Sequence, residues 1–205
     1  MNILKRIYRK IFRKKPYILG LNSKVYPYVD MSNANGRKED LVIGDHTHVK
    51  AELLMILGHG GKISIGDFCY VGRNTHIWSG KSITIGNRVL ISHNCNIFDN
   101  DTHPKDPEER HKQYKEIITK GQPKVIDLKD EEVIIEDDVW LGANVTIMKG
   151  VSIGRGSIIG ANSLVLENVP ADKFYAGHPA KFIKKLETYG FTKAIGFPIK
   201  GEGRP

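Results

Sequence analysis

The most regular feature of the chain is an aliphatic residue that returns at every sixth position between residues 135 and 165. These positions are Ile135, Leu141, Ile147, Ile153, Ile159 and Val165. The next position is glycine after Leu141, Ile153 and Ile159, and the fifth position of each unit is small or β-branched. A period of six fits neither an α-helix nor a strand that alternates every two residues. It is typical of a parallel β-helix, in which a short strand and a turn recur every hexad and three hexads complete one coil.

The same period occurs earlier in the chain. It begins at Ile43, blurs over residues 52–61 and resumes at Ile65, and a two-residue shift resets its phase at Ile85. Together the repeats predict an all-β domain over residues 42–170 with roughly five coils, whose aliphatic positions form the core.

The repeat stops after Ile97, where the next aliphatic position would fall on His103. Residues 99–130 contain no hexad and three prolines. A long insertion in a compact repeat is more often functional than not. We therefore interpret these residues as an inserted loop without regular structure, which projects from the prism and packs on another subunit.

Both flanks of the repeat region lack its period. Residues 16–41 predict an irregular lead-in with one strand near Lys24–Val29. At the other end, residues 171–205 predict a cap and a tail. In this segment Ala180–Glu187 is expected to form a short helix that covers the open end of the prism, and residues 190–205 are expected to be extended or partly disordered.

Residues 1–15 place apolar side chains at helical spacing with basic residues between them, and Pro16 follows. This pattern predicts a basic amphipathic helix. One interpretation is that the helix docks on an anionic membrane surface. The other is that its apolar stripe packs on the body of the protein or on a neighbouring subunit.

The charge of the chain is unevenly distributed. There are 31 Lys and Arg residues against 23 Asp and Glu, and seven of the basic ones lie within residues 1–15, without an acid. The remainder is nearly neutral, and no nucleic-acid-binding motif is present, which argues against a nucleic-acid partner. No apolar run is long enough to span a bilayer, and no signal-peptide pattern is visible. We therefore expect a cytoplasmic protein.

The two cysteines and several histidines are best interpreted as structural residues, without a role in metal binding or catalysis. Cys69 and Cys95 occupy the fifth position of a hexad, where small residues stand elsewhere, so we expect buried thiols. His46 and His48 share one repeat and His59 lies in another; all three are expected at surface corners, so no metal site is predicted.

Three further segments carry a family resemblance: NRVLISHNCNIFDNDTHP (87–104), the stretch from DDVWLGANV to LENVPA (137–171) and AGHPAKFIKK (176–185). Together they resemble the hexapeptide-repeat acyltransferases, in particular the maltose, galactoside and polysaccharide O-acetyltransferases. The match covers roughly residues 42–187. It implies a left-handed β-helix and a homotrimer that binds acetyl-CoA in the groove between neighbouring prisms.

The resemblance also implies a catalytic base. Acyl transfer to a hydroxyl requires a base for the hydroxyl proton, and neutral histidine suits this role. His103 stands in the THP motif where the repeat breaks, and the family uses the histidine of this motif as general base. The side chain of Asp101 or Asp99, or a backbone carbonyl, could orient its ring.

For the acyl donor, the resemblance implies a row of small residues beside a tryptophan, with basic residues for the CoA phosphates. The corresponding positions are Trp140, Gly142, Ala143, Gly160, Ala161, Lys181 and Lys184. Met148 and Lys149 depart from the family's usual small residue and proline.

The acceptor site is expected around Asn74 and His76, in the coil before the THP motif. These residues match the maltose and galactoside patterns poorly. This mismatch argues against free maltose or galactoside as the acceptor. The basic helix at residues 1–15 alone favours a lipid-linked sugar built at the inner membrane face, in capsule or O-antigen synthesis. The alternatives are N-acetylation of an amino-sugar nucleotide, acetylation of an antibiotic or serine, and a trimeric scaffold without activity.

Overall fold

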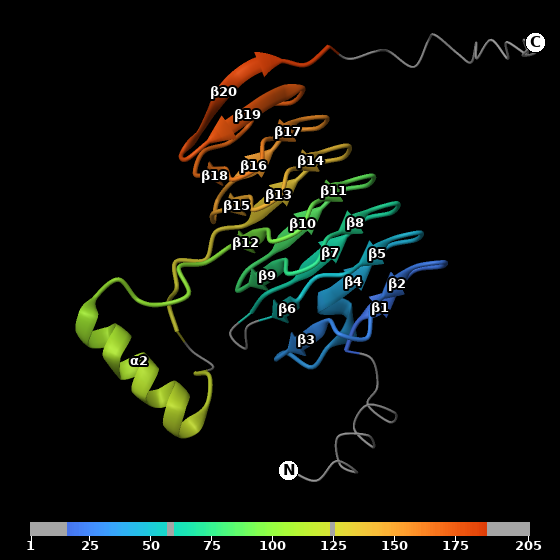
Figure 1. Cartoon of the computed structure of the whole chain (residues 1–205). Helices are drawn as coiled ribbons and strands as arrows, with labels where there is room; N and C mark the ends of the chain where they lie inside the picture. Colours follow the sequence, from blue (N-terminus) through green and yellow to red (C-terminus); the bar gives the residue numbers. More distant parts are fainter. Residues whose placement is uncertain (1–15, 57–59, 124–125, 188–205) are drawn as a thin grey trace, which may run out of the picture.

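The computed structural model describes residues 16–56, 60–123 and 126–187. Strands stack in coils from β1 at one end to β20 at the other, and each face of the resulting prism is a sheet (Figure 1). The first sheet contains β1 (Ile18–Leu19), β4 (Leu41–Ile43), β7 (Ile63–Ile65), β10 (Ile83–Ile85), β13 (Val133–Ile135) and β16 (Ser152–Ile153).

The other two faces are built in the same way. The second sheet contains β2 (Lys24–Val25), β5 (His48–Val49), β8 (Tyr70–Val71), β11 (Leu90–Ile91), β14 (Trp140–Leu141), β17 (Ile158–Ile159), β19 (Lys173–Gly177) and β20 (Ala180–Lys185). The third contains β3 (Asp30–Asn33), β6 (Leu53–Ile56), β9 (His76–Ser79), β12 (Asn96–Phe98), β15 (Thr146–Ile147) and β18 (Leu164–Val165). A short 3₁₀ helix covers Lys38–Asp40, and the α-helix α2 covers Pro107–Lys120.

The aliphatic position of each hexad lies inside the prism, as the period predicts. On the first sheet Ile65, Ile85, Ile135 and Ile153 are paired in register from coil to coil, and each is at most 1% exposed. Cys69 and Cys95 are buried and free, which confirms their predicted structural role.

The strand predicted near Lys24–Val29 is present as β2, but the irregular lead-in predicted around it is wrong. Residues 18–33 form a complete first coil, in which β1, β2 and β3 pair in parallel with β4, β5 and β6. These strands contain two to four residues, too few to show a period of their own. The hydrogen bonds of the next coil hold them in place.

The predicted C-terminal helix is also wrong, because residues 180–185 form strand β20. Strand β19 extends the second sheet in parallel beyond β17, and β20 returns antiparallel to it. The hairpin covers the end of this sheet, so pairing with unsatisfied backbone groups outweighs helix formation here. The predicted tail at 190–205 and the predicted helix at 1–15 fall outside the described residues.

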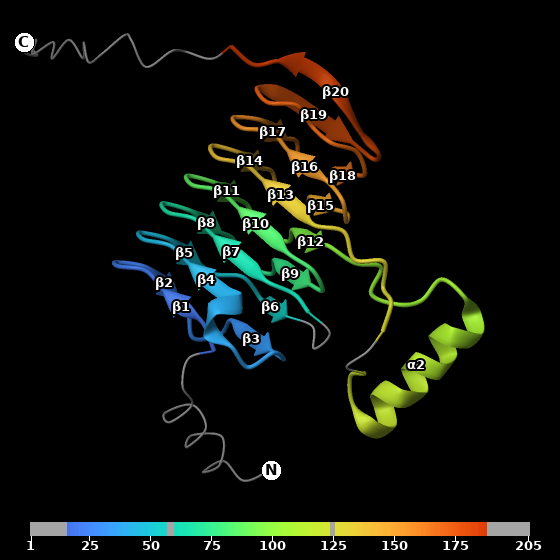
Figure 2. The same cartoon turned by 180° about the vertical axis from the view of Figure 1, so that it is seen from behind.

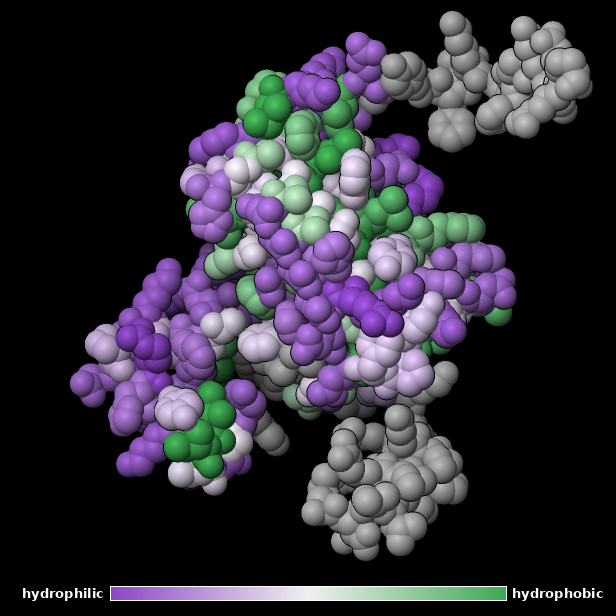
Figure 3. Space-filling model, in the orientation of Figure 1, coloured by the Kyte–Doolittle hydropathy of each residue, from purple (hydrophilic) through white to green (hydrophobic). Residues whose placement is uncertain are grey.

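The insertion between β12 and β13 is not structureless. It contains α2, which Asp106 caps by accepting hydrogen bonds from the backbone nitrogens of Glu108 and Glu109, with Pro107 in the first turn. Both cartoon views show α2 projecting from the prism, as expected of the insertion (Figures 1 and 2), and the space-filling view shows a mostly hydrophilic surface around it (Figure 3). Within the described residues, no helix is long and apolar enough to cross a membrane.

Candidate active site

His103 lies at the start of the insertion, on a tightly held turn. The carboxylate of Asp99 is fully buried and accepts hydrogen bonds from the Ser79 hydroxyl at 2.7 Å and from the side-chain amide of Asn100 at 2.9 Å. Asn100 accepts a bond from the backbone nitrogen of Thr102, which has a positive φ of 59°. The root of the insertion is therefore fixed to the prism immediately before His103.

The ring of His103 is oriented by Gln113, which was not predicted from the sequence. The Nδ1 atom lies 2.7 Å from Oε1 of Gln113, a residue of α2 that is only 6% exposed. The Gln113 amide nitrogen donates to the carbonyl of Thr102 at 3.4 Å. With the amide in this orientation its oxygen accepts a hydrogen bond from the N–H group at Nδ1, so Nε2 carries the lone pair.

The Asp101 carboxylate forms no hydrogen bond with the His103 ring, contrary to one of the predicted alternatives. Its carboxylate accepts a hydrogen bond from the Lys149 ammonium at 3.1 Å and lies 3.4 Å from that of Lys105. Lys149 also lies 3.3 Å from the carboxylate of Glu131. Asp99 is likewise committed to the buried bonds of the turn, so Gln113 takes the orienting place expected of either aspartate.

A groove of about 470 Å³ lies on the second sheet near its C-terminal end. Six of the seven residues predicted to bind the acyl donor line it: Trp140, Gly142, Ala143, Gly160, Ala161 and Lys184. Its walls are otherwise largely apolar, with Phe174, Ile158 and Leu186. The seventh residue, Lys181, does not line the groove, and its ammonium lies 3.5 Å from the Glu167 carboxylate.

The glycines of the groove have a steric cause. A Cβ atom on Gly142 would lie 2.6 Å from the backbone nitrogen of Ala161, and one on Gly160 would lie 2.8 Å from the Cβ of Ala176. Real Cβ atoms do not approach other atoms so closely, so stacking of the coils excludes side chains here. The bare backbone leaves room for a thin, extended ligand beside the half-exposed ring of Trp140.

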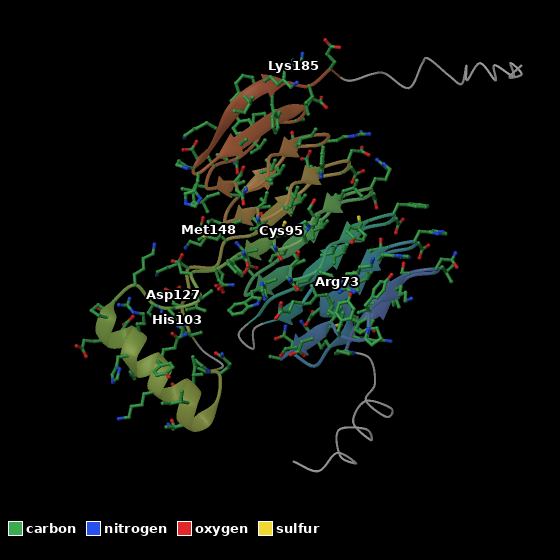
Figure 4. All side chains as sticks on the ribbon, in the orientation of Figure 1. Arg73, Cys95, His103, Asp127, Met148 and Lys185 are labelled. Carbon is green, nitrogen blue, oxygen red and sulfur yellow. The ribbon has the colours of Figure 1, made fainter. Side chains whose placement is uncertain are left out.

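His103 and the groove lie on different parts of one chain. His103 lines a separate cavity of about 380 Å³ at the root of the insertion, with Asp127 among its lining residues, and the two cavities share no residue. Figure 4 shows His103 and Asp127 beside α2, with Met148 where the insertion meets the prism. The insertion follows the third sheet, whereas Trp140 belongs to the second. A single chain therefore does not bring them together.

The predicted acceptor residues line neither of these cavities. Asn74 is exposed at a corner of the prism with a positive φ of 56°. Nδ1 of His76 lies 3.2 Å from the side-chain oxygen of Asn96, and its Nε2 lies 3.9 Å from the Glu52 carboxylate.

Comparison with known proteins places this arrangement in a family. Residues 132–167 match the family model of the bacterial transferase hexapeptide (six repeats). The galactoside O-acetyltransferase of Lactococcus lactis is 31% identical over 160 residues, which cover 75% of this chain and 69% of that protein. The chain belongs to the hexapeptide-repeat acetyltransferases. WbbJ of Escherichia coli, provisionally named a lipopolysaccharide biosynthesis O-acetyl transferase, is 36% identical over 65% of this chain and 67% of its own length.

Solved structures agree on the architecture of this acetyltransferase. AntD, an N-acyltransferase from Bacillus cereus, superposes with a TM-score of 0.67 at 19% identity in a complex of its S84T mutant with dTDP and coenzyme A, over 87% of this chain and 89% of AntD. The acetyltransferase VCA0836 from Vibrio cholerae, complexed with acetyl coenzyme A, gives a TM-score of 0.51 at 24% identity over 91% and 79%. The fold is the left-handed parallel β-helix predicted from the sequence.

Proposed function

We propose that this acetyltransferase transfers an acetyl group from acetyl-CoA to a sugar hydroxyl in surface polysaccharide synthesis. One observation supports this reaction type: because Nδ1 of His103 is hydrogen-bonded to Gln113, Nε2 is left as the proton acceptor. O-acetyl transfer is the activity named for the relatives from L. lactis and E. coli, and lipopolysaccharide is named for the latter.

The groove on the second sheet fits the donor. Its bare row at Gly142 and Gly160 would take a pantetheine arm, Trp140 would cover the reactive end, and Lys184 would face the phosphates. When bound, acetyl-CoA supplies the acyl thioester. The largely apolar walls would exclude water from the reacting atoms, which limits hydrolysis.

His103 acts as the general base in this proposal. Its Nε2 takes the proton of the acceptor hydroxyl as that oxygen attacks the acyl carbon, and it returns the proton to the departing sulfur. Gln113 holds the ring so that this nitrogen faces the substrate in both steps. No nucleophilic side chain of the protein is required.

A complete site requires a second copy of the chain, because His103 and the Trp140 groove belong to different faces of one prism. We propose a homotrimer in which the insertion of one subunit faces the groove of its neighbour. The sequence of residues 1–15 supports peripheral contact with the inner membrane face, where a lipid-linked acceptor would be found.

The test is release of CoA in the presence of free sugars, sugar nucleotides and lipid-linked sugars, followed by mass spectrometry of the product. We expect a sugar ester and a loss of about 10²–10⁴-fold in kcat for His103→Ala. An amide product would instead support N-acetylation, the activity class of AntD. Undiminished transfer by His103→Ala would contradict the base assignment.

A further inference from the structure

The groove belongs to a column of residues that runs the length of the second sheet. In each coil, the backbone nitrogen of the column residue donates to the carbonyl that precedes the next one, as Lys50 does to Val71 and Gly142 to Ile159. From the N-terminal coil upward, the column contains Tyr26, Lys50, Gly72, Ser92, Gly142 and Gly160.

The column changes character below the groove. From Gly160 down to Gly72 its residues are glycine or serine, so no large side chain covers the backbone. The next two positions hold Lys50 and Tyr26. Lys50 lies three coils from Gly142, about 14 Å at a spacing of ~4.8 Å per coil. The bare row therefore ends on a basic and aromatic surface.

This surface is a connected group, which we call the aromatic–basic cluster: Lys24, Tyr26, Tyr28, Lys50, Tyr70 and Arg73. The Lys50 ammonium lies 5.0 Å from the ring centre of Tyr26 and 5.3 Å from that of Tyr70. The rings of Tyr26 and Tyr28 are 5.8 Å apart. Figure 4 shows Arg73 on the prism, away from His103.

The cations of the cluster are available to an anion. Among the described residues, no ion pair involves Lys24, Lys50 or Arg73, and their recorded partners are tyrosine rings. A cation that lies above an aromatic ring faces the ring on one side only, so the N–H donors on its other side remain free for other partners. Lysine and arginine are common phosphate ligands. The rings of Tyr28 and Tyr70, 47% and 36% exposed, offer flat apolar faces beside them.

Building on the proposed function, we propose that the aromatic–basic cluster binds the phosphate end of the acceptor, and that the acceptor is a phosphate-activated sugar. The reacting hydroxyl would lie near Trp140, and the phosphate would lie down the bare row at Lys50. The distance from Gly142 to Lys50 along the column, less the length of the Lys50 side chain, is comparable with the length of one sugar ring that carries a diphosphate. A neutral glycan would leave three cations without a role.

The first test is binding of inorganic pyrophosphate by calorimetry, with CoA at saturation so that the groove is occupied. We expect Lys50→Met and Arg73→Gln each to weaken pyrophosphate binding about tenfold, the usual effect of losing one charge-assisted bond. Lys38→Met removes the same charge from an exposed position on the 3₁₀ helix and serves as the matched control. Equal binding by the wild type and both cluster variants would overturn the proposal.

The second test compares acceptors. A sugar diphosphate linked to a nucleoside and one linked to a lipid separate the two sources of the same chemistry, and the free sugar is the neutral comparison. Lys50→Met should raise KM for the phosphate-bearing acceptor about tenfold with kcat retained, and leave KM for acetyl-CoA unchanged. A free sugar used as well as its diphosphate would contradict the proposal. If no acceptor is acetylated by the wild type while the cluster still binds pyrophosphate, the proposed function fails instead.

Discussion

The Nδ1 atom of His103 and the Oε1 atom of Gln113 lie 2.7 Å apart and join the end of the repeat to the helix that interrupts it. Because Gln113 is buried and its amide nitrogen is bonded to Thr102, the pair defines which ring nitrogen is available as a base. In the proposed mechanism, the role of His103 as base therefore depends on the folded α2.

The first prediction concerns Gln113. Gln113→Leu should lower kcat about tenfold or more, because the ring loses its partner and the tautomer is no longer fixed. Gln113→Glu should restore part of kcat and move the acidic limb of the pH–rate profile upward, because a carboxylate stabilises the charged imidazole. The exposed neighbour Lys112→Ala is the control. An unchanged pH–rate profile in Gln113→Glu would show that this contact is absent in the working enzyme.

The second prediction concerns Lys149, which holds both ends of the insertion. Its side chain is 15% exposed and donates to the Asp101 carboxylate at 3.1 Å and to the carbonyl of Lys129 at 2.7 Å. Lys149→Met should lower the free energy of unfolding by about 1–3 kcal/mol, because partly buried acceptors lose their donor. It should also speed proteolysis within the insertion.

A double-mutant cycle separates this contact from general damage. Asp101→Asn combined with Lys149→Met should cost less than the sum of the two single changes, since each removes the same ion pair. Lys115→Met, on the exposed side of α2, should alter neither stability nor proteolysis. Strictly additive losses would show that Asp101 and Lys149 act independently.

The third prediction concerns the two thiols. Burial raises the pKa of Cys69 and of Cys95, and the side chains are 4% and 0% exposed. Neither should react with a thiol reagent in the native protein, and both should react after unfolding in guanidinium. Tyr114→Cys, at an exposed position of α2, provides the reactive comparison. Rapid labelling of the native wild type would contradict this and would also disturb a thiol-based assay of CoA release.

Structural features that are set by residues close together in the sequence could be predicted, whereas features that depend on contacts between distant residues could not. The hexad period distinguishes the inside from the outside of each coil, so the core at Ile65 or Ile153 followed directly from it. The residues of the groove at Gly142 came from the family resemblance and not from the period. The start of α2 was also present in the sequence, as Asp106 and Pro107 followed by two glutamates, and was overlooked.

Other features could not be read from local patterns. Strand β20 forms because β19 presents an edge, and that edge exists only once the coils are stacked. Gln113 contacts His103 because α2 folds back onto the start of the insertion. The aromatic–basic cluster joins Tyr26 to Lys50 and Tyr70, which lie in three successive coils and are far apart in the sequence.

The last prediction concerns stability in acid. Arg88, from the coil below, donates to the Asp138 carboxylate at 2.6 Å and holds the pKa of that group below its usual value. The folded-state pKa is the lower one, so the stabilisation is present above the unfolded-state pKa and is lost as the pH falls through the folded-state value. Because this carboxylate is about one-third exposed, the contribution should be no more than about 1 kcal/mol.

Asp138→Asn tests this without disturbing the corner. Asp138 has a positive φ of 62°, a conformation that asparagine also tolerates, so the substitution removes the charge and keeps the backbone. We expect a slightly lower Tm than the wild type at pH 7 and an equal Tm near pH 2, where the wild-type carboxylate is protonated. Asp138→Ala should be less stable than Asp138→Asn at both pH values, because alanine is strained in this turn. A difference in Tm between wild type and Asp138→Asn that persists unchanged into acid would show that the charge of Asp138 is not its source.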